Sequence, residues 1–303
     1  MKEVTGLADA WARELGKTGY DKDNELAALI TKTFSPEVVT APSALIERMF
    51  DQSTIGEFDD YRIEKAPKNT IQVYDAVAGG NVDRSYIDHT VLTPTWRTLQ
   101  AETDISLQAL RMNGFKTVAE LLNYINEALE QRKLSVIFGI VDTAITSSHA
   151  GYIDGTAATD PSDTVVKSLA LYLNDVTDGE VPFIFGLNKY MQVISGLPGV
   201  TTYLTDTVKN QYNTTGRISN YAGCDLIGFS GQKKQADGTL AIPNKKIFGV
   251  AGKIGDAITR GETRVLQNTD INSEKIHIKV GGYTFGALIK DIDKVGKIAL
   301  KTN

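Results

Sequence analysis

The sequence has little of what chemistry at a protein site usually requires. Its 303 residues include one cysteine and three histidines. A single cysteine cannot form an internal disulfide, so a secreted, disulfide-stabilised framework is excluded and a reducing cytosol is the expected compartment. No segment approaches the roughly 18 consecutive apolar residues of a membrane-spanning helix, and the charged, amphipathic N-terminus does not resemble a signal peptide.

The charge balance is mildly acidic. The chain carries 37 acidic and 32 basic residues, which gives a formal net charge of -5. A dedicated nucleic-acid binder usually has a basic excess or a basic stripe, so this class is disfavoured, although a protein that merely encloses nucleic acid is not. A hydrophobic content of 42% in a chain of this length is enough for a sizeable core, and the length favours two domains.

The only cysteine lies in the stretch GRISNYAGCDLIGFSG, residues 216–231. Cys224 is flanked by Ala222, Gly223, Leu226 and Ile227, and the nearest basic residue before it is Arg217. A reactive thiolate needs a nearby cation or a helix N-terminus, whereas a free cysteine in an apolar strand behaves as a small hydrophobic residue. We therefore interpret Cys224 as part of a strand and not as a nucleophile.

No other motif predicts chemistry. His89, His149 and His277 have no second histidine or cysteine at metal-ligand spacing. The glycines of residues 249–255 fit neither a P-loop nor a dinucleotide-binding pattern, because Ile254 stands where a P-loop needs Ser or Thr. The sequence therefore predicts no catalytic, cofactor-binding or metal-binding residue.

Two regions of the chain lack an apolar face large enough to stand alone. Helical patterns at 4–15, 25–34 and 43–50 are short and need another surface. Residues 57–105 read as a long hairpin, with strand-like runs on both sides of an Ala-Gly-Gly-Asn turn at 78–81. An isolated hairpin is marginally stable, so this one must pair with, or lie across, something else.

The remaining chain predicts a packed α+β fold. A capping box at Thr117–Glu120 predicts a helix from about 118 to at least 133, and residues 134–145 either extend it or begin a buried segment. A second long helix is expected at 162–177 because Asp160-Pro161 is a helix-start signal. Strands are expected at 182–185, 222–229, 242–251, 276–280 and 297–300, with a short helix at 188–194.

This order of elements resembles the tailed-phage major capsid proteins of the Hong Kong 97 type. VPFIFGLNKYMQVISGLPGVTTY resembles the strand and helix of that family's axial domain, and TGRISNYAGCDLIGF resembles a recurrent strand of the same domain. IPNKKIFGVAGKIG resembles a segment found downstream, and GGYTFGALIKDIDKVGKIAL resembles the final strands. The resemblance covers nearly the whole chain, and its specificity lies in the order of the motifs.

The resemblance implies a division of the chain into consecutive segments. The expected segments are an N-terminal arm (1–56), an extended loop (57–105), a peripheral domain with a long spine helix (106–180), an axial domain (181–260) and return strands to the peripheral domain (261–303). Cys224 would lie in the axial-domain sheet. Contacts between subunits are expected at Trp11, Leu15, Ala78, Gly79, Gly80, Asn81, Arg84, Tyr86 and Trp96.

The function that the resemblance implies is structural. A protein of this family forms hexamers and pentamers of itself in an icosahedral head shell and encloses double-stranded DNA without reading its sequence. It is not an enzyme, has no cofactor, and is found in the virion, or in the host cytoplasm during assembly. A portal and a decoration protein are further partners implied by the resemblance.

Two departures from the family limit what is carried over. The founding member begins with a long scaffolding domain, whereas only residues 1–56 precede the loop here, so a separate scaffolding protein is expected. That member also joins a loop lysine to a neighbour's asparagine, and Lys65, Lys68 and Asn81 do not match that pair, so no covalent cross-link is expected. Two alternatives stay open: an encapsulin-like nanocompartment shell and a soluble cytosolic enzyme with an unrecognised site.

Overall fold

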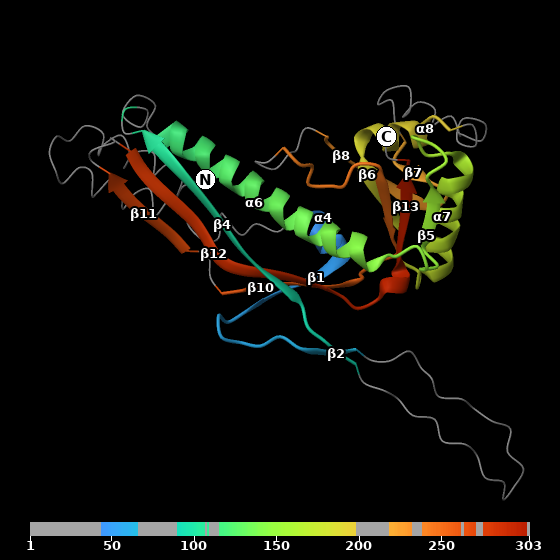
Figure 1. The fold of residues 1–303 in the computed structure, drawn as a ribbon, viewed down its shortest axis with the longest axis horizontal. Helices are drawn as coiled ribbons and strands as arrows, with labels where there is room; N and C mark the ends of the chain where they lie inside the picture. The colour runs from blue at the N-terminus through green and yellow to red at the C-terminus, as the bar shows by residue number, and fades with distance from the viewer. Residues whose placement is uncertain are drawn as a thin grey trace, which may run out of the picture.

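The structure, a computed structural model, describes residues 44–65, 90–106, 108, 115–197, 218–231, 238–261, 264–270 and 275–301. These residues form a five-stranded sheet, a six-stranded sheet and a short two-stranded ribbon (Figure 1). Helices accompany both sheets, so the α+β class predicted from the sequence is confirmed.

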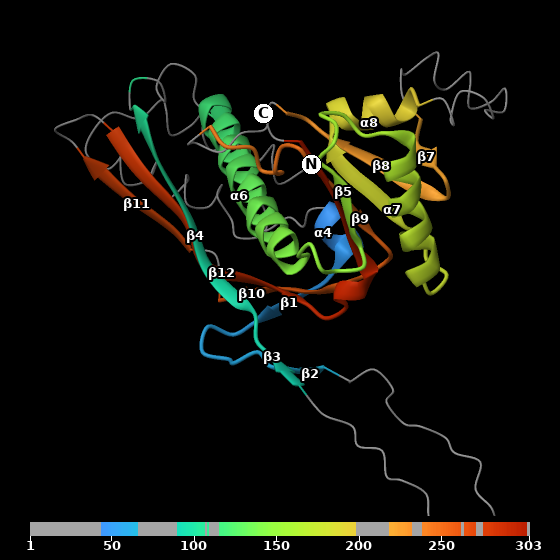
Figure 2. The ribbon, with the colours of Figure 1, turned by 45° about the vertical axis from the view of Figure 1, so that its right-hand side comes forward.

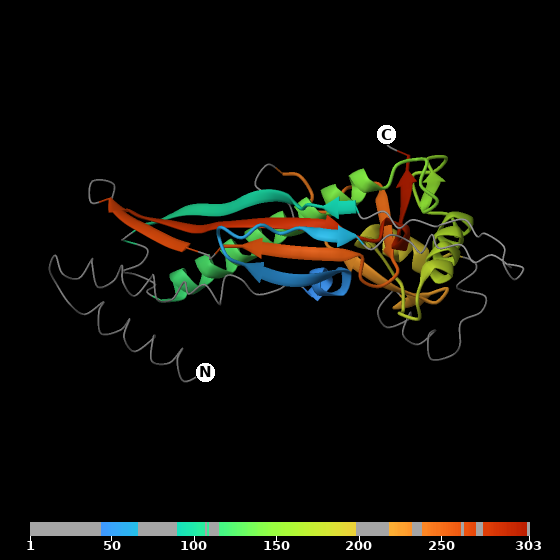
Figure 3. The same ribbon diagram turned by 90° about the horizontal axis from the view of Figure 1, so that it is seen from below.

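The five-stranded sheet is organised around its longest strand. Its members are β1 (Phe50–Ile55), β10 (Gly255–Arg260), β12 (Lys275–Ile289), β11 (Arg264–Asp270) and β4 (Thr95–Ser106). One edge of β12 pairs with β11 and then with β10, the other edge pairs with β4, and β1 adds to β10 in parallel (Figure 3). Ile276, Ile278 and Val280 are fully buried, as their alternation predicts.

A pair of glycines marks the point where β12 changes partner. The register against β4 shifts between Gly281 and Tyr283, next to the place where pairing with β11 ends and pairing with β10 begins. Gly281 has a φ of 130°, and a Cβ atom on it would lie 2.5 Å from the carbonyl oxygen of Leu99. Only glycine fits this bulge without moving β4.

One long helix lies along the five-stranded sheet. Helix α6 (Phe115–Ala144) has 30 residues, and α4 (Ala44–Met49) packs near its C-terminal half (Figures 1 and 2). The buried side chains of α6 follow one stripe and join the core of the sheet. They are Ile125, Leu129, Leu134, Ile137, Phe138 and Val141. This spacing explains why the segment is helical, because it places the apolar residues on one face.

The six-stranded sheet has its own hydrophobic core. Its strand order is β5 (Tyr152–Gly155), β13 (Val295–Leu300), β9 (Lys246–Val250), β6 (Phe183–Leu187), β8 (Cys224–Phe229) and β7 (Asn220–Tyr221). Helix α7 (Asp163–Val176) covers this sheet with Val166, Leu169, Ala170 and Leu173, all fully buried. Helix α8 (Asn188–Ser195) follows β6, and a short 3₁₀ turn (Ile292–Lys294) precedes β13.

Aromatic rings join α6 to the six-stranded sheet. The ring of Phe138 lies 5.3 Å from that of Phe185 on β6 and 6.1 Å from that of Phe248 on β9. Phe229 on β8 meets it edge-on at 6.3 Å. Such pairs add about 0.5–1.5 kcal/mol each beyond burial, so α6 is packed against both sheets and fixes one relative to the other.

A lysine–carboxylate cluster holds the C-terminal end of α6. Lys297 Nζ on β13 donates to the carbonyl oxygens of Ile145, at 2.7 Å, and Asp142, at 2.9 Å. The Asp142 carboxylate also accepts from Lys297 and from Lys246 on β9, at 3.1 and 2.6 Å. The last carbonyls of a helix lack intrahelical donors and attract cations. Burial alone would raise the pKa of Asp142, but the hydrogen bonds from both lysines hold it below its ordinary value.

The helices predicted from the sequence are confirmed where the structure describes them. The pattern at 43–50 corresponds to α4, that at 162–177 to α7 and that at 188–194 to α8. Residues 134–144 extend the long helix, which settles the alternative left open by the sequence. The predicted capping box is wrong, because α6 begins at Phe115 and Thr117 lies inside it.

Strand pairing crosses the segments expected from the family. Strand β1, expected in the arm, pairs with β10, and β4, expected in the extended loop, pairs with β12. Strand β13, expected to return to the peripheral domain, pairs with β5 of that expected domain and also with β9 of the expected axial domain. The order of segments along the chain cannot reveal such pairings, because the partners lie far apart in sequence. Most of the expected arm and loop lies in 1–43 and 66–89, outside the described residues.

We expect Lys297→Met to lower the free energy of unfolding by about 1–3 kcal/mol, because it leaves buried acceptors on α6 without a donor. Urea titration measures this loss. The pKa of Asp142 is depressed, so the stability it contributes is complete above its ordinary value of 3.8 and is lost as the pH falls below it. The difference in the free energy of unfolding between Lys297→Met and the unmodified protein should therefore become smaller below that pH.

Lys253→Met is the matched control. Its ion pair with Asp51 joins two side chains that are 51% and 61% exposed, so its loss should lower the free energy of unfolding much less than Lys297→Met does. Equal losses for the two variants would contradict the role assigned to Lys297.

Candidate assembly surfaces

The described residues contain no group of three or more His, Cys, Asp and Glu side chains placed to bind a metal ion. Within the same ranges no helix is long and apolar enough to cross a membrane. Cys224 is fully buried in β8, with Asn174 Nδ2 3.8 Å from its sulfur. Burial raises the pKa of this thiol to about 11, so it stays protonated at neutral pH. This placement agrees with the interpretation of Cys224 as a small core residue.

A two-stranded ribbon extends away from both sheets. Strands β2 (Ile63–Lys65) and β3 (Thr90–Leu92) pair antiparallel, and the ribbon lies clear of the packed body in two views (Figures 1 and 2). It is the described base of the predicted hairpin. Two residues after β3 the chain enters β4, so the ribbon is attached directly to the edge of the five-stranded sheet.

A buried carboxylate fixes the other leg of the ribbon to the same sheet. The Tyr61 hydroxyl donates to Asp256 Oδ2 at 2.8 Å, and Lys290 Nζ lies 2.7 Å from Asp256 Oδ1. Asp256 is only 3% exposed, so its charge depends on these two partners. Burial, followed by the bond to Asp256, raises the pKa of Tyr61 to about 12, which keeps its proton available for this bond.

The turn before Tyr61 presents an aromatic side chain to solvent. Phe58 is 91% exposed, which is more than any other large hydrophobic side chain of the described residues. The turn itself is held in place: Gly56 N–H donates to Asp59 Oδ2 at 2.9 Å, Arg260 Nε donates to the carbonyl of Glu57 at 2.7 Å, and Arg264 forms an ion pair with the Glu57 carboxylate at 2.7 Å. Phe58 is therefore displayed by a rigid support.

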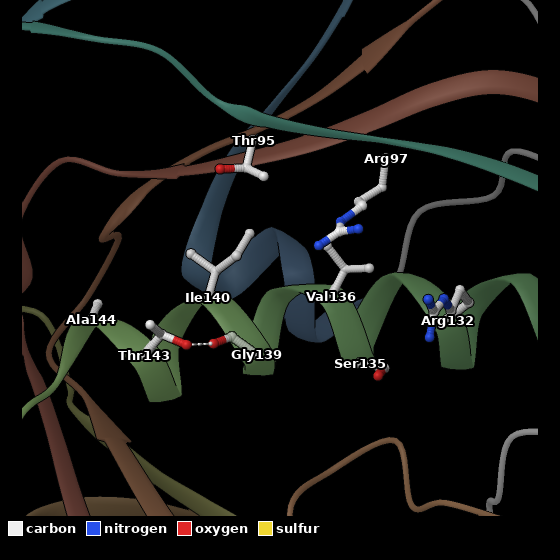
Figure 4. A pocket seen from close by; sticks show the side chains of 9 residues that line it. All are labelled: Thr95, Arg97, Arg132, Ser135, Val136, Gly139, Ile140, Thr143 and Ala144. Carbon is white, nitrogen blue, oxygen red and sulfur yellow. Dashed lines mark hydrogen bonds between the residues drawn. The ribbon is translucent and has the colours of Figure 1, made fainter. Parts of the chain in front are cut away.

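A groove of about 640 Å³ runs between α6 and the start of β4 (Figure 4). The helix contributes an apolar floor with Val136, Ile140 and Ala144. Among the described residues that line the groove, the charged ones are Arg97 from β4 and Arg132 from α6. Gly139 also lies on the floor, and a Cβ atom added to it would meet nothing within 4 Å, so the groove is open at that point.

Other exposed apolar side chains lie on the half of the molecule built on the six-stranded sheet. Leu171 on α7 is 71% exposed, Val181 before β6 is 57% exposed, and Val193 on α8 is 36% exposed. These residues are separate positions on the outer surface of this half, and water-exposed side chains of this kind are available for contact with another chain.

Most interface residues expected from the sequence lie outside the described residues. These are Trp11, Leu15, Ala78, Gly79, Gly80, Asn81, Arg84 and Tyr86. Trp96 is described, and it is half-buried within its own subunit: a Cβ on Gly286 would lie 2.9 Å from its ring, and the guanidinium of Arg260 lies 5.7 Å from the ring centroid. Sequence reasoning passed over Phe58, although a phenylalanine inside the acidic run Glu-Phe-Asp-Asp was a visible signal.

Comparison with known proteins rests on structure. No family model and no curated protein sequence matches the chain. The capsid of a native GTA particle is similar with a TM-score of 0.61 and 11% identity, over 87% of this chain and 92% of that one. The capsid of cyanophage P-SCSP1u is similar with a TM-score of 0.58 and 13% identity, over 96% and 98%. A virus-like particle from Pyrococcus furiosus is similar with a TM-score of 0.50 and 11% identity, over 86% and 94%.

These likenesses extend over most of both chains in every case. Identities of 11–13% carry no argument from individual residues, so the likeness lies in the arrangement of helices and strands. The chain therefore has the fold of tailed-phage major capsid proteins of the Hong Kong 97 type.

Proposed function

We propose that this chain is the major capsid protein of a tailed bacteriophage, which assembles with copies of itself into the icosahedral head shell and encloses double-stranded DNA. The observation that carries the proposal is the extent of the likeness to phage capsids, which reaches 96% of this chain and 98% of the cyanophage capsid chain. A fold shared from one end to the other leaves little of the chain free for an added catalytic domain.

The projecting ribbon supports a role in assembly. A two-stranded ribbon is marginal by itself in water, and exposed strand edges invite pairing with other chains. In a shell, neighbouring subunits cover such a ribbon. Many modest contacts per subunit then stabilise the particle, although no single contact needs to be large.

The two halves of the molecule suggest how the domains are arranged. We assign the five-stranded sheet with α4 and α6 to the peripheral domain, in which α6 is the spine helix. The six-stranded sheet with α7 and α8 is assigned to the axial domain, around which hexamers and pentamers form. Residues 1–43 and 66–89 then supply the arm and the loop that overlap neighbouring subunits.

The proposal includes partners and a location. A separate scaffolding protein directs assembly, a portal occupies one vertex, and a decoration protein is a further candidate partner. The chain is found in the virion, and in the host cytoplasm during assembly. Its net charge of -5 suits a wall around DNA, because like charge limits adhesion of the genome. This role requires no enzymatic activity.

The alternative shell function is an encapsulin-like compartment around an enzyme cargo. The likeness to the Pyrococcus furiosus virus-like particle supports this alternative. Its TM-score of 0.50 is below the 0.61 of the GTA capsid, so the support is weaker. The N-terminal arm and the extended hairpin predicted from the sequence favour the viral shell.

We expect the purified full-length chain, alone or with its scaffolding protein, to form closed particles visible by negative-stain electron microscopy. Particles recovered from infected or induced cells should contain double-stranded DNA that is protected from nuclease. Particles filled with one protein cargo would favour the compartment instead. A chain that stays monomeric or dimeric and turns over a substrate would overturn the shell function.

We expect deletion of residues 1–35 to abolish closed shells while both sheets stay folded, because the described residues of both cores lie after this segment. Circular dichroism and urea titration check the fold, and electron microscopy checks the particles. Shells of normal size from the truncated chain would contradict the role assigned to the arm.

A further inference from the structure

We propose that Tyr61 and Arg260 are positioning residues of assembly: they set the direction in which the ribbon of β2 and β3 leaves the five-stranded sheet. We call two contacts at the base of the ribbon the clamp. The first joins Tyr61 to Asp256, and the second joins Arg260 to both Glu57 and Trp96. The inference rests on the proposed function, because the ribbon has a neighbour to bind only if the chain assembles.

The two legs of the ribbon leave its direction undetermined. One leg, residues 93 and 94, runs from β3 directly into β4 and ties the ribbon to the edge of the sheet at one point. The other leg, residues 56–62, joins β1 to β2. Fully extended, a leg of this length spans about 23 Å, at about 3.3 Å per residue. A ribbon with one short leg and one slack leg can swing about the short leg, so chain connectivity alone does not fix where it points.

The first contact of the clamp removes this slack. The Tyr61 hydroxyl donates to Asp256 Oδ2 at 2.8 Å, and only Arg62 separates Tyr61 from the first residue of β2. Asp256 lies on β10, between β1 and β12, and its other carboxylate oxygen is 2.7 Å from Lys290 Nζ. A carboxylate that is 3% exposed is costly to leave without one of its partners, so the bond to Tyr61 is strongly favoured.

The second contact joins the two legs to each other. Arg260, the last residue of β10, donates from Nε to the carbonyl oxygen of Glu57 in the long leg, at 2.7 Å. Its guanidinium also lies 5.7 Å from the ring centroid of Trp96, which follows the short leg as the second residue of β4. That ring is itself held against the sheet, because a Cβ atom on Gly286 would lie 2.9 Å from it. A planar guanidinium can stack and donate at the same time, so one side chain of the sheet holds both legs.

A ribbon with a fixed direction binds a neighbour at a lower cost. The ribbon lies clear of the packed body, so its own contacts do not restrict it further out (Figures 1 and 2). A ribbon that samples many directions must lose that freedom when it binds, whereas a clamped ribbon has already lost it. In a closed shell the same contact recurs between neighbours, so a direction shared by all subunits also favours one curvature.

The test measures the direction of the ribbon in the unassembled full-length subunit. Val91→Cys on β3 and Tyr124→Cys on α6 carry spin labels at side chains that are 53% and 67% exposed, whereas Cys224 is buried. Electron paramagnetic resonance should give one narrow distribution of distances between the two labels. Tyr61→Phe should widen this distribution about twofold, because the slack of the long leg returns.

Tyr221→Phe is the matched control. The Tyr221 hydroxyl also donates to a carboxylate oxygen, Asp163 Oδ1, at 2.8 Å, but it joins β7 to α7, away from the ribbon. This variant should leave the distribution unchanged. Arg260→Met leaves the partners of Asp256 in place and should widen the distribution as Tyr61→Phe does. Urea titration checks that each variant is folded.

The same variants test the link to assembly. Tyr61→Phe should raise the protein concentration needed for closed shells about fivefold and broaden the range of shell diameters, because each contact must then also order the ribbon. Tyr221→Phe should change neither. Light scattering measures the concentration, and negative-stain electron microscopy measures the diameters.

The outcomes separate this inference from the proposed function. A distribution that is broad in the unmodified subunit, or that stays narrow in both Tyr61→Phe and Arg260→Met, would show that the clamp does not set the direction. A wider distribution with unchanged shells would show that the direction does not govern assembly, and this too would overturn the inference. If the unmodified chain never forms shells, the proposed function fails, while the distances still show whether the clamp holds the ribbon.

Discussion

The packing of Phe138 against Phe185 and Phe248 positions helix α6, and with it the five-stranded sheet, against the six-stranded sheet. Helix α6 lies along the five-stranded sheet, and its apolar stripe shares one core with Phe183, Phe185 and Phe248 of the six-stranded sheet. Lys297 and Lys246 hold the same end of the helix through Asp142. Apolar packing supplies most of the binding energy of this junction, and the ion pairs specify the position at which the helix stops, because charged groups are costly to bury anywhere else.

The ribbon depends on this rigid body. Tyr61 connects it to β10 through the carboxylate of Asp256, which is 3% exposed and also forms an ion pair with Lys290. The consequence is a sharp change from a packed sheet to an exposed ribbon within a few residues. A protein that must bind several neighbours benefits from such a boundary. The base of the ribbon is held rigidly by the sheet, so less conformational entropy is lost when the ribbon binds another chain, and no larger core is needed.

The sequence predicted the helices well and the pairing of strands poorly. The stripe that includes Ile125 and Leu129 and the alternation at Ile276, Ile278 and Val280 are local patterns, which a periodicity analysis detects, whereas the extension of the helix past residue 133 was left open. That β1 belongs with β10, or β13 with β9, depends on contacts between distant segments, which no local pattern contains. The candidate assembly surfaces were even harder to predict from the sequence than the strand pairing. Phe58 was visible as an aromatic among acids, but the groove between α6 and β4 exists only once Arg97 and Arg132 are brought together by folding.

The parallel pairing of β1 with β10 also has a consequence for synthesis. Phe50 leaves the ribosome early, yet its partner Gly255 follows only near the end of the chain, and β5 likewise waits for β13. Proteins dominated by such distant pairings fold slowly and expose unpaired edges in the meantime. Neither sheet is complete until β12 and β13 have been translated, so β1 and β5 lack their partner strands during most of synthesis.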